Sequence, residues 1–327
     1  MEFVVALRDM TGDGKDTLIG NLACAGAYAI FGLNLVACKN IANCGLISPM
    51  ALFCLRALGA LILFWIASAF LPKAEKAEKA EKVERRDMLK IAAASFLGLF
   101  LTQISFLKAI TMTTPVDASL ISLLSPIAAM IVAAIVLKDK ITKHGVVGLA
   151  ISFAGVVFIV LNSVSIRSGA SETSILGIVL MVVNVLSFAT YVGIFKPLIK
   201  KYRVVTFMKW MFIFATLYSL PFGIRDLATI PYAQIPANIV LQILFVVVFA
   251  TFIAYFLIPI GQKRISPMIV CMYTYLQPVI AMSISFALGL DTMTWPKAIA
   301  TAFILIGVSI CNFSPREIVR KPHPQAN

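Results

Sequence analysis

Long apolar segments alternate with short polar ones along the whole chain. Each apolar segment is about as long as a helix that crosses the roughly 30 Å hydrocarbon core of a bilayer. Backbone groups cannot bond to water there, so such segments must be helical; barrel strands would be half as long and would alternate in polarity. The pattern therefore predicts ten transmembrane helices, at about residues 18–37, 47–70, 89–107, 115–137, 145–161, 175–195, 205–223, 237–258, 267–290 and 296–313.

The composition agrees with this pattern. Apolar residues make up 60% and charged residues 13% of the 327 positions, and the mean hydropathy is +0.95. These values lie far outside those of soluble domains. The expected fold class is an all-α integral membrane protein, with the lipid bilayer as its first partner.

The basic residues predict an orientation for these helices. With the N-terminus in the cytoplasm, 21 of the 28 Lys and Arg residues fall in inner segments, including a charged loop at 72–88 and a tail at 316–327. The positive-inside rule then predicts a multi-pass protein of the cell (cytoplasmic or inner) membrane with both termini cytoplasmic. The same asymmetry accounts for the net charge of +13, so no nucleic-acid partner is expected.

A repeat appears when the chain is shifted against itself by 152 residues. Residues 115–159 then align with 267–311 without a gap, and prolines, an aspartate, a threonine and a glycine coincide. This indicates a duplication of five helices, with one repeat over 1–161 and a second over 162–315. The identical first-repeat positions are Pro115, Leu124, Pro126, Ala129, Met130, Asp139, Thr142, Ala150, Gly155 and Val156.

The two repeats are predicted to lie in opposite orientations. An odd number of spans per repeat places the second copy upside down in the membrane. The loop charges agree, because the inner KDKITK at 138–143 pairs with the outer LDTMTW at 290–295, which has no lysine. Inverted repeats are typical of secondary transporters, in which two bundles rock around a site near the midplane.

The chain resembles the EamA-type branch of the drug/metabolite transporter superfamily. The resemblance runs from Gly32, Asn34 and Lys39 in the first helix, through LRALGALILF at 55–64, to the closing GLAISFAGVVFIVL segment and its counterpart at Gly307. The chain departs from the family in its acidic loops, where aspartate replaces the usual glutamate. The resemblance implies a transporter of small organic metabolites whose path is surrounded by helices 1, 3, 4, 6, 8 and 9.

Polar stripes mark the predicted substrate-facing surfaces of helices 4 and 9. Serines recur every three residues in helix 4, and the repeat places Cys271, Thr274 and Gln277 at the same positions of helix 9. Polar side chains in a membrane face other helices or an aqueous cavity, although small ones also serve as plain packing surfaces. The residues expected to contact substrate here are Ser122, Ser125, Tyr273, Thr274 and Gln277.

Helices 1, 3, 6 and 8 supply further candidates. Asn21, Cys24 and Tyr28 in helix 1 have the same spacing as Asn184, Ser187 and Tyr191 in helix 6. Because the resemblance places helices 3 and 8 along the path, it adds one polar residue from each. The candidates from these four helices are Tyr28, Gln103, Asn184, Tyr191 and Tyr255.

Two prolines and one arginine stand out inside the predicted helices. Pro126 and Pro278 occupy equivalent positions and each removes a backbone donor, so they are expected to be hinges, or else ordinary kinks. Arg56 lies deep in helix 2. A cation at that depth is either a functional group that contacts substrate or one half of a structural pair, with Asp117 as its partner.

The sequence lacks nucleotide-binding, metal-binding and hydrolytic motifs, so no enzyme activity, cofactor or metal is expected. The spans contain no glutamate, which favours facilitated export or exchange over strong proton coupling. The expected function is alternating-access export of an amino-acid-like or related amphipathic metabolite. A nucleotide-sugar or phosphometabolite antiporter is the alternative within transport, and a membrane enzyme or receptor the alternative outside it. The oligomer is left open between monomer and homodimer.

Overall fold

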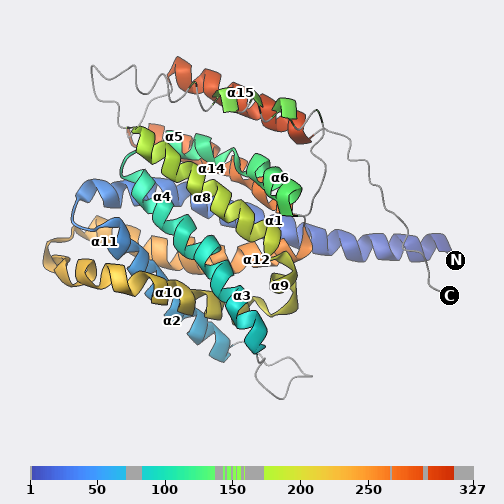
Figure 1. Ribbon diagram of the computed structural model, residues 1–327, viewed down its shortest axis with the longest axis horizontal. Coiled ribbons are helices and arrows are strands. Elements are labelled where there is room, and N and C mark those ends of the chain that lie inside the picture. The colour runs from blue at the N-terminus through green and yellow to red at the C-terminus, as the bar shows by residue number, and fades with distance from the viewer. Residues whose placement is uncertain are drawn as a thin grey trace.

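A computed structural model describes residues 2–70, 83–136, 173–265, 267–289 and 294–312, together with short pieces between 143 and 158. Every regular element in these ranges is helical, as the apolar pattern predicts. The helices pack side by side into one body, and the N-terminal end of α1 extends beyond it (Figure 1). The charged loop predicted at 72–88 lies largely outside the described residues, and the tail at 316–327 lies wholly outside them.

The first half of the described chain contains three helical stretches after the N-terminal helix. One of them changes to a π-helix along its length, and another is broken by a turn at Leu123 and Leu124. The elements are α1 (Glu2–Cys44), α2 (Pro49–Phe70), α3 (Arg85–Ser95), the π-helix η1 (Phe96–Leu101), α4 (Thr102–Ile110), α5 (Pro115–Ser122) and α6 (Ser125–Val136).

The second half is also helical throughout its described elements. Its elements are α8 (Ile175–Ile194), α9 (Lys196–Lys201), α10 (Val204–Thr229), the 3₁₀-helix η2 (Tyr232–Gln234), α11 (Ala237–Phe245), the π-helix η3 (Val246–Ile253), α12 (Ala254–Arg264), α13 (Pro267–Met272), the 3₁₀-helix η4 (Tyr273–Tyr275), α14 (Leu276–Ala287) and α15 (Trp295–Asn312).

Seven helical stretches of the described residues are long and apolar enough to cross a membrane. The structure also has shorter apolar helices at Val146–Gly155 and Ile269–Ser285. The chain is therefore a multi-pass membrane protein, which confirms the all-helical membrane class predicted from the sequence. The predicted span at 145–161 is described only in pieces.

Both helices that contain the paired prolines are interrupted before the proline. The first breaks at Leu123 and Leu124, between α5 and α6, and the second at η4, between α13 and α14. Proline at position i removes the hydrogen bond to the carbonyl of residue i−4 and crowds that carbonyl. For Pro126 that carbonyl belongs to Ser122, and it accepts instead from Ser125 Oγ at 2.7 Å.

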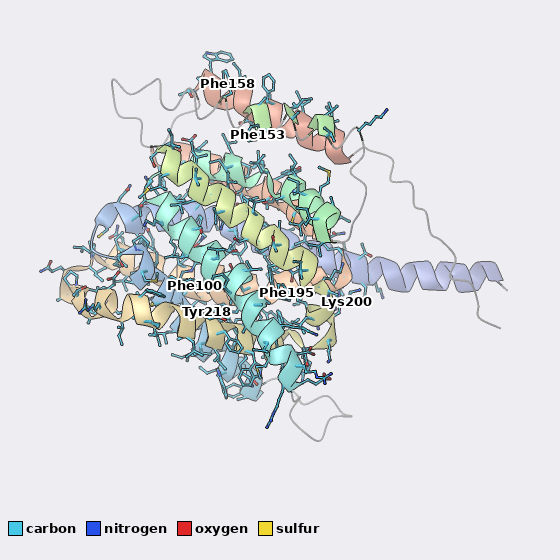
Figure 2. All side chains as sticks on the ribbon, viewed as in Figure 1. Phe100, Phe153, Phe158, Phe195, Lys200 and Tyr218 are labelled. Atoms are coloured by element: carbon cyan, nitrogen blue, oxygen red, sulfur yellow. The ribbon has the colours of Figure 1, made fainter. Side chains whose placement is uncertain are left out.

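The two halves are interleaved in the body. α1 packs against α12 and α14 of the second half, while α8 packs against α4 and α6 of the first. α2 lies against α10, and each of them also packs on the π-helix of the other half, α2 on η3 and α10 on η1. Phe100 of η1 and Tyr218 of α10 show this contact, with ring centroids 5.9 Å apart (Figure 2).

A glycine permits a close approach between α8 and η1. An added Cβ on Gly98 in η1 would stand 2.5 Å from Cγ of the Tyr191 ring, closer than real side-chain atoms come. The ring of Tyr191 therefore lies directly against the backbone of η1. This contact fixes how near α8 comes to the helix that carries Gln103.

Candidate functional site

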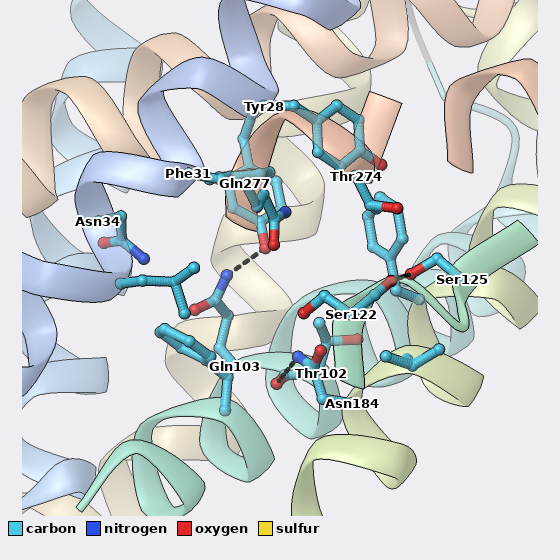
Figure 3. A pocket seen from close by; sticks show the side chains of 15 residues that line it. Tyr28, Phe31, Asn34, Thr102, Gln103, Ser122, Ser125, Asn184, Thr274 and Gln277 are labelled. Atoms are coloured by element: carbon cyan, nitrogen blue, oxygen red, sulfur yellow. Dashed lines mark hydrogen bonds between the residues drawn. The ribbon is translucent and has the colours of Figure 1, made fainter. Parts of the chain in front are cut away.

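A cavity of about 70 Å³ lies at the centre of the body, between both halves of the chain. Helices α1, α4, α5, α6, α8, α12 and α14 and the turn η4 surround it (Figure 3). The residues that line it are Tyr28, Phe31, Asn34, Leu35, Thr102, Gln103, Phe106, Ser122, Ser125, Asn184, Val185, Phe188, Tyr255, Thr274 and Gln277.

Most of the residues predicted to contact substrate meet at this cavity. They come from six separate stretches of sequence, so only the fold brings them together. Their role in binding stays a prediction, but their common location is a property of the structure. They are Tyr28, Gln103, Ser122, Ser125, Asn184, Tyr255, Thr274 and Gln277.

Three of the predicted residues do not line the cavity. Tyr191 is buried behind it, where its ring covers Gly98 and its hydroxyl donates to Gln262 Oε1 at 3.4 Å. Tyr273 is half-buried in the 3₁₀-helix η4, outside the lining. Arg56 is buried in α2, next to the cavity rather than in its wall.

Sequence reasoning missed the apolar part of the wall. Phe31 and Leu35 follow Tyr28 by three and seven residues and so share its helical face, and Phe106 follows Gln103 by three. A search for polar residues does not detect these apolar positions. They can be predicted from each polar candidate, because residues three, four or seven positions away share its helical face.

Most hydrogen-bond donors in the wall are already used within the protein. Ser122 donates to Ala118 O at 3.0 Å, Thr274 to Cys271 O at 2.6 Å, and the amide of Asn184 to Thr102 O at 2.7 Å. The amide of Gln103 donates to the hydroxyl of Tyr255 (Figure 3). The hydroxyl oxygens keep lone pairs that can accept from a bound molecule.

Two polar atoms of the wall have no partner within the described residues. They are Oε1 of Gln103 and the hydroxyl of Tyr28, and both are buried. An unpaired buried polar atom costs about 1–3 kcal/mol, so these two atoms favour a bound solute or water. The wall thus offers mainly hydrogen-bond acceptors to a bound molecule.

Aromatic rings form the rest of the enclosure. Phe31 stands edge-on to both Tyr28 and Tyr255, with ring centroids 5.7 Å apart in each pair. No residue of the lining carries a formal charge at neutral pH. The described residues contain no group of three or more side chains that could hold a metal ion. The described lining therefore combines hydrogen-bond acceptors with aromatic surface.

A multi-pass helical membrane protein with a polar cavity between interleaved halves has the architecture of a solute transporter. The sequence profile of the EamA-like transporter family matches the chain twice, at residues 18–161 and 175–313. The chain belongs to this family, as the sequence motifs predicted.

Similar proteins agree with this assignment. The chain is 22% identical over 242 residues to the uncharacterized transporter YetK of Bacillus subtilis, covering 74% of this chain and 71% of YetK. It is 28% identical over 201 residues to an uncharacterized transporter of Archaeoglobus fulgidus, covering 59% of this chain and 66% of that protein. A crystal structure with 17% identity has the same fold, with a TM-score of 0.62 over 93% of this chain and 99% of that one.

Proposed function

We propose that this transporter moves a small amphipathic metabolite outward through the central cavity, by rocking two inverted five-helix halves about it. The observation that carries the proposal is the arrangement of equivalent positions across the cavity. Gln103 and Tyr255, Ser122 and Thr274, and Ser125 and Gln277 are each separated by 152 residues, and every one of the six lines the cavity.

The packing of the helices supports an inverted relation between the halves. α1 contacts α12 and α14, and its counterpart α8 contacts α4 and α6, so each half encloses part of the other in the same way. Two related bundles can rock between two conformations, one open to each side of the membrane. In this proposal they rotate about the cavity, which equivalent residues of both halves line.

The size of the cavity supports a closed conformation. Pockets that hold small molecules are about 300–1,000 Å³, whereas this one is about 70 Å³. A metabolite therefore needs the helices around it to separate. In the structure, hydrogen bonds tie the bundle together at both ends of these helices.

One end is held by contacts between α3 and the C-terminal end of α9 with the residue that follows it. The carboxylate of Asp87 is buried and accepts from Lys201 Nζ at 2.6 Å, Lys90 Nζ at 3.1 Å and the Tyr202 hydroxyl at 2.8 Å. We call this the Asp87 cluster. By the distribution of basic residues it lies on the cytoplasmic side.

The opposite end is held by contacts between the first half and the start of α8. The hydroxyl of Thr173 donates to the carboxylate of Asp117 at 2.5 Å, and the backbone N–H of Ser174 donates to Met112 O at 2.8 Å. Export requires these contacts to open while the Asp87 cluster stays closed, and loading requires the reverse. The uncharged lining favours exchange or facilitated movement over proton coupling.

Two-sided labelling of a single cysteine tests the proposal without knowledge of the solute. In a variant from which the native cysteines are removed, Ser122→Cys is expected to react with a membrane-impermeant maleimide added to either face of a vesicle. Leu217→Cys, on an exposed apolar surface of α10, is the unreactive control. Labelling of Ser122→Cys from one face alone would contradict alternating access.

A further inference from the structure

Arg56 is a buried cation with most of its hydrogen-bonding capacity unused. It lies seven residues after the start of α2, or about 10 Å along the helix, and is 1% exposed. Its Nε donates to Thr251 Oγ1 at 2.8 Å. Both Nη atoms are buried and find no hydrogen-bond partner among the described residues.

No carboxylate neutralises Arg56 in the described part of the chain. The expected structural pair with Asp117 does not form, because that carboxylate is hydrogen-bonded to Thr173 and the described ion pairs use Lys90, Lys201 and Arg264. A buried charge without a partner is costly in a membrane and marks a functional site by default. Binding of an anion offsets the free-energy cost of this buried charge.

Two residues connect Arg56 to the cavity wall. Its guanidinium interacts electrostatically with Tyr255 and Cys38. Cys38 in turn donates to Asn34 Oδ1 at 3.3 Å. Tyr255 and Asn34 both line the cavity, so Arg56 is linked to the wall through these two side chains.

We propose that Arg56 is an anion subsite of this cavity and that the transported solute carries a carboxylate, which binds to its two Nη atoms. The inference rests on the proposed transport function. A guanidinium presents parallel N–H groups that match the two oxygens of a carboxylate. The single charge of Arg56 balances one carboxylate, whereas a phosphate dianion would keep an uncompensated charge because the lining itself holds no cation.

The rest of the cavity wall fits the remainder of such a solute. Gln103 Oε1 and the hydroxyl oxygens accept hydrogen bonds, and the rings of Phe31, Phe106 and Phe188 supply apolar surface. The expected solute is therefore a small carboxylate with an apolar body and at least one N–H or O–H donor.

Stability without ligand gives a first test. Arg56→Met keeps an apolar stem of similar length and removes the charge, and Thr251 keeps its own bond to Val246 O at 2.7 Å. If the charge of Arg56 has no partner until an anion binds, it destabilises the ligand-free protein. The thermal unfolding midpoint of the purified ligand-free variant should then rise by roughly 2–4 °C. A lower midpoint would show a structural arginine and overturn the inference.

Binding gives the second test. The purified protein is heated with a pool of small carboxylic acids, with a pool of the matching primary amides, and with inorganic phosphate at equal ionic strength. Only the carboxylates should raise the midpoint of the wild-type protein. The rise should vanish in Arg56→Met, shrink in Arg56→Lys and persist in Lys209→Met, which removes a cation that stacks on Trp65 away from the cavity.

Other results count against the subsite. The anion subsite is overturned if amides or phosphate raise the unfolding midpoint as much as carboxylates do. It is also overturned if carboxylates leave the wild-type midpoint unchanged, or raise the midpoint of Arg56→Met as much as that of the wild type. The labelling of Ser122→Cys does not depend on ligand chemistry. Two-sided labelling without a carboxylate effect removes the anion subsite alone, and a carboxylate effect with one-sided labelling removes alternating access alone.

Discussion

The side-chain amide of Gln103 donates a hydrogen bond to the hydroxyl of Tyr255, and these two residues are 152 positions apart. The same interval relates residues 115–159 to 267–311 in the sequence. Under the proposed duplication, the bond joins equivalent positions of the two halves. Gln103 lies two residues after the end of the π-helix η1, and Tyr255 lies two residues after the end of the π-helix η3.

Removing one partner of this bond should cost more than removing both. Tyr255→Phe leaves the whole amide of Gln103 buried and unpaired, because its Oε1 already lacks a partner. We expect a loss of about 1–3 kcal/mol in unfolding free energy. In the double variant with Gln103→Leu, most of that loss should be recovered, since neither polar group remains. Denaturation of the four proteins in detergent measures the coupling, and simple additivity would show that the bond contributes nothing.

The broken helices at the paired prolines should matter more for motion than for folding. Pro278→Ala restores the N–H that can donate to the carbonyl of Thr274, within η4. We expect equal or higher stability together with slower conversion between the two open states. The measurement is the rate at which Ser122→Cys in this background becomes reactive from each face. Unchanged rates on both faces would leave Pro278 as an ordinary kink.

The Asp87 cluster should control opening at its own end of the bundle. Asp87→Asn weakens its bonds to Lys201 and Lys90, so labelling of Ser122→Cys from that end should rise several-fold while labelling from the other end falls. Lys90→Met is the matched control, because Lys90 is largely exposed and its pair with Asp87 contributes little. Equal labelling from both ends in Asp87→Asn would exclude the cluster as a gate.

The same cluster should not respond to pH in the physiological range. The carboxylates of Asp87 and then Glu84 raise the pKa of Lys201 above its usual 10.5 by hydrogen bonding to the ammonium. A raised lysine pKa stabilises the cluster fully below the unfolded value and loses that contribution only as the pH rises through the folded one. Labelling from this end should therefore be constant between about pH 6 and 9, and a change within that window would point to another titrating group.

Sequence periodicity located the helices and most polar residues of the cavity, because both depend on local spacing. The equivalence of Ser122 with Thr274 was visible in the same way. The irregular segments were not, because nothing in the pattern shows that the helix tightens to 3₁₀ geometry at η4, where Tyr273 lies. The position of Tyr191 outside the lining could not be predicted for a different reason. Its contact with Gly98 joins residues far apart in sequence, which no local pattern reveals.

That contact leads to a test of what Tyr191 does. Gly98→Ala places a methyl group about where the Tyr191 ring lies, so overpacking should lower the unfolding free energy by about 1–3 kcal/mol. Combining it with Tyr191→Leu should relieve the clash and recover stability. Tyr191→Leu alone should lower stability and leave the carboxylate-induced thermal shift intact, because Tyr191 lies behind the cavity wall. Loss of that shift in a stable Tyr191→Leu protein would instead show that the ring contacts the solute in another conformation.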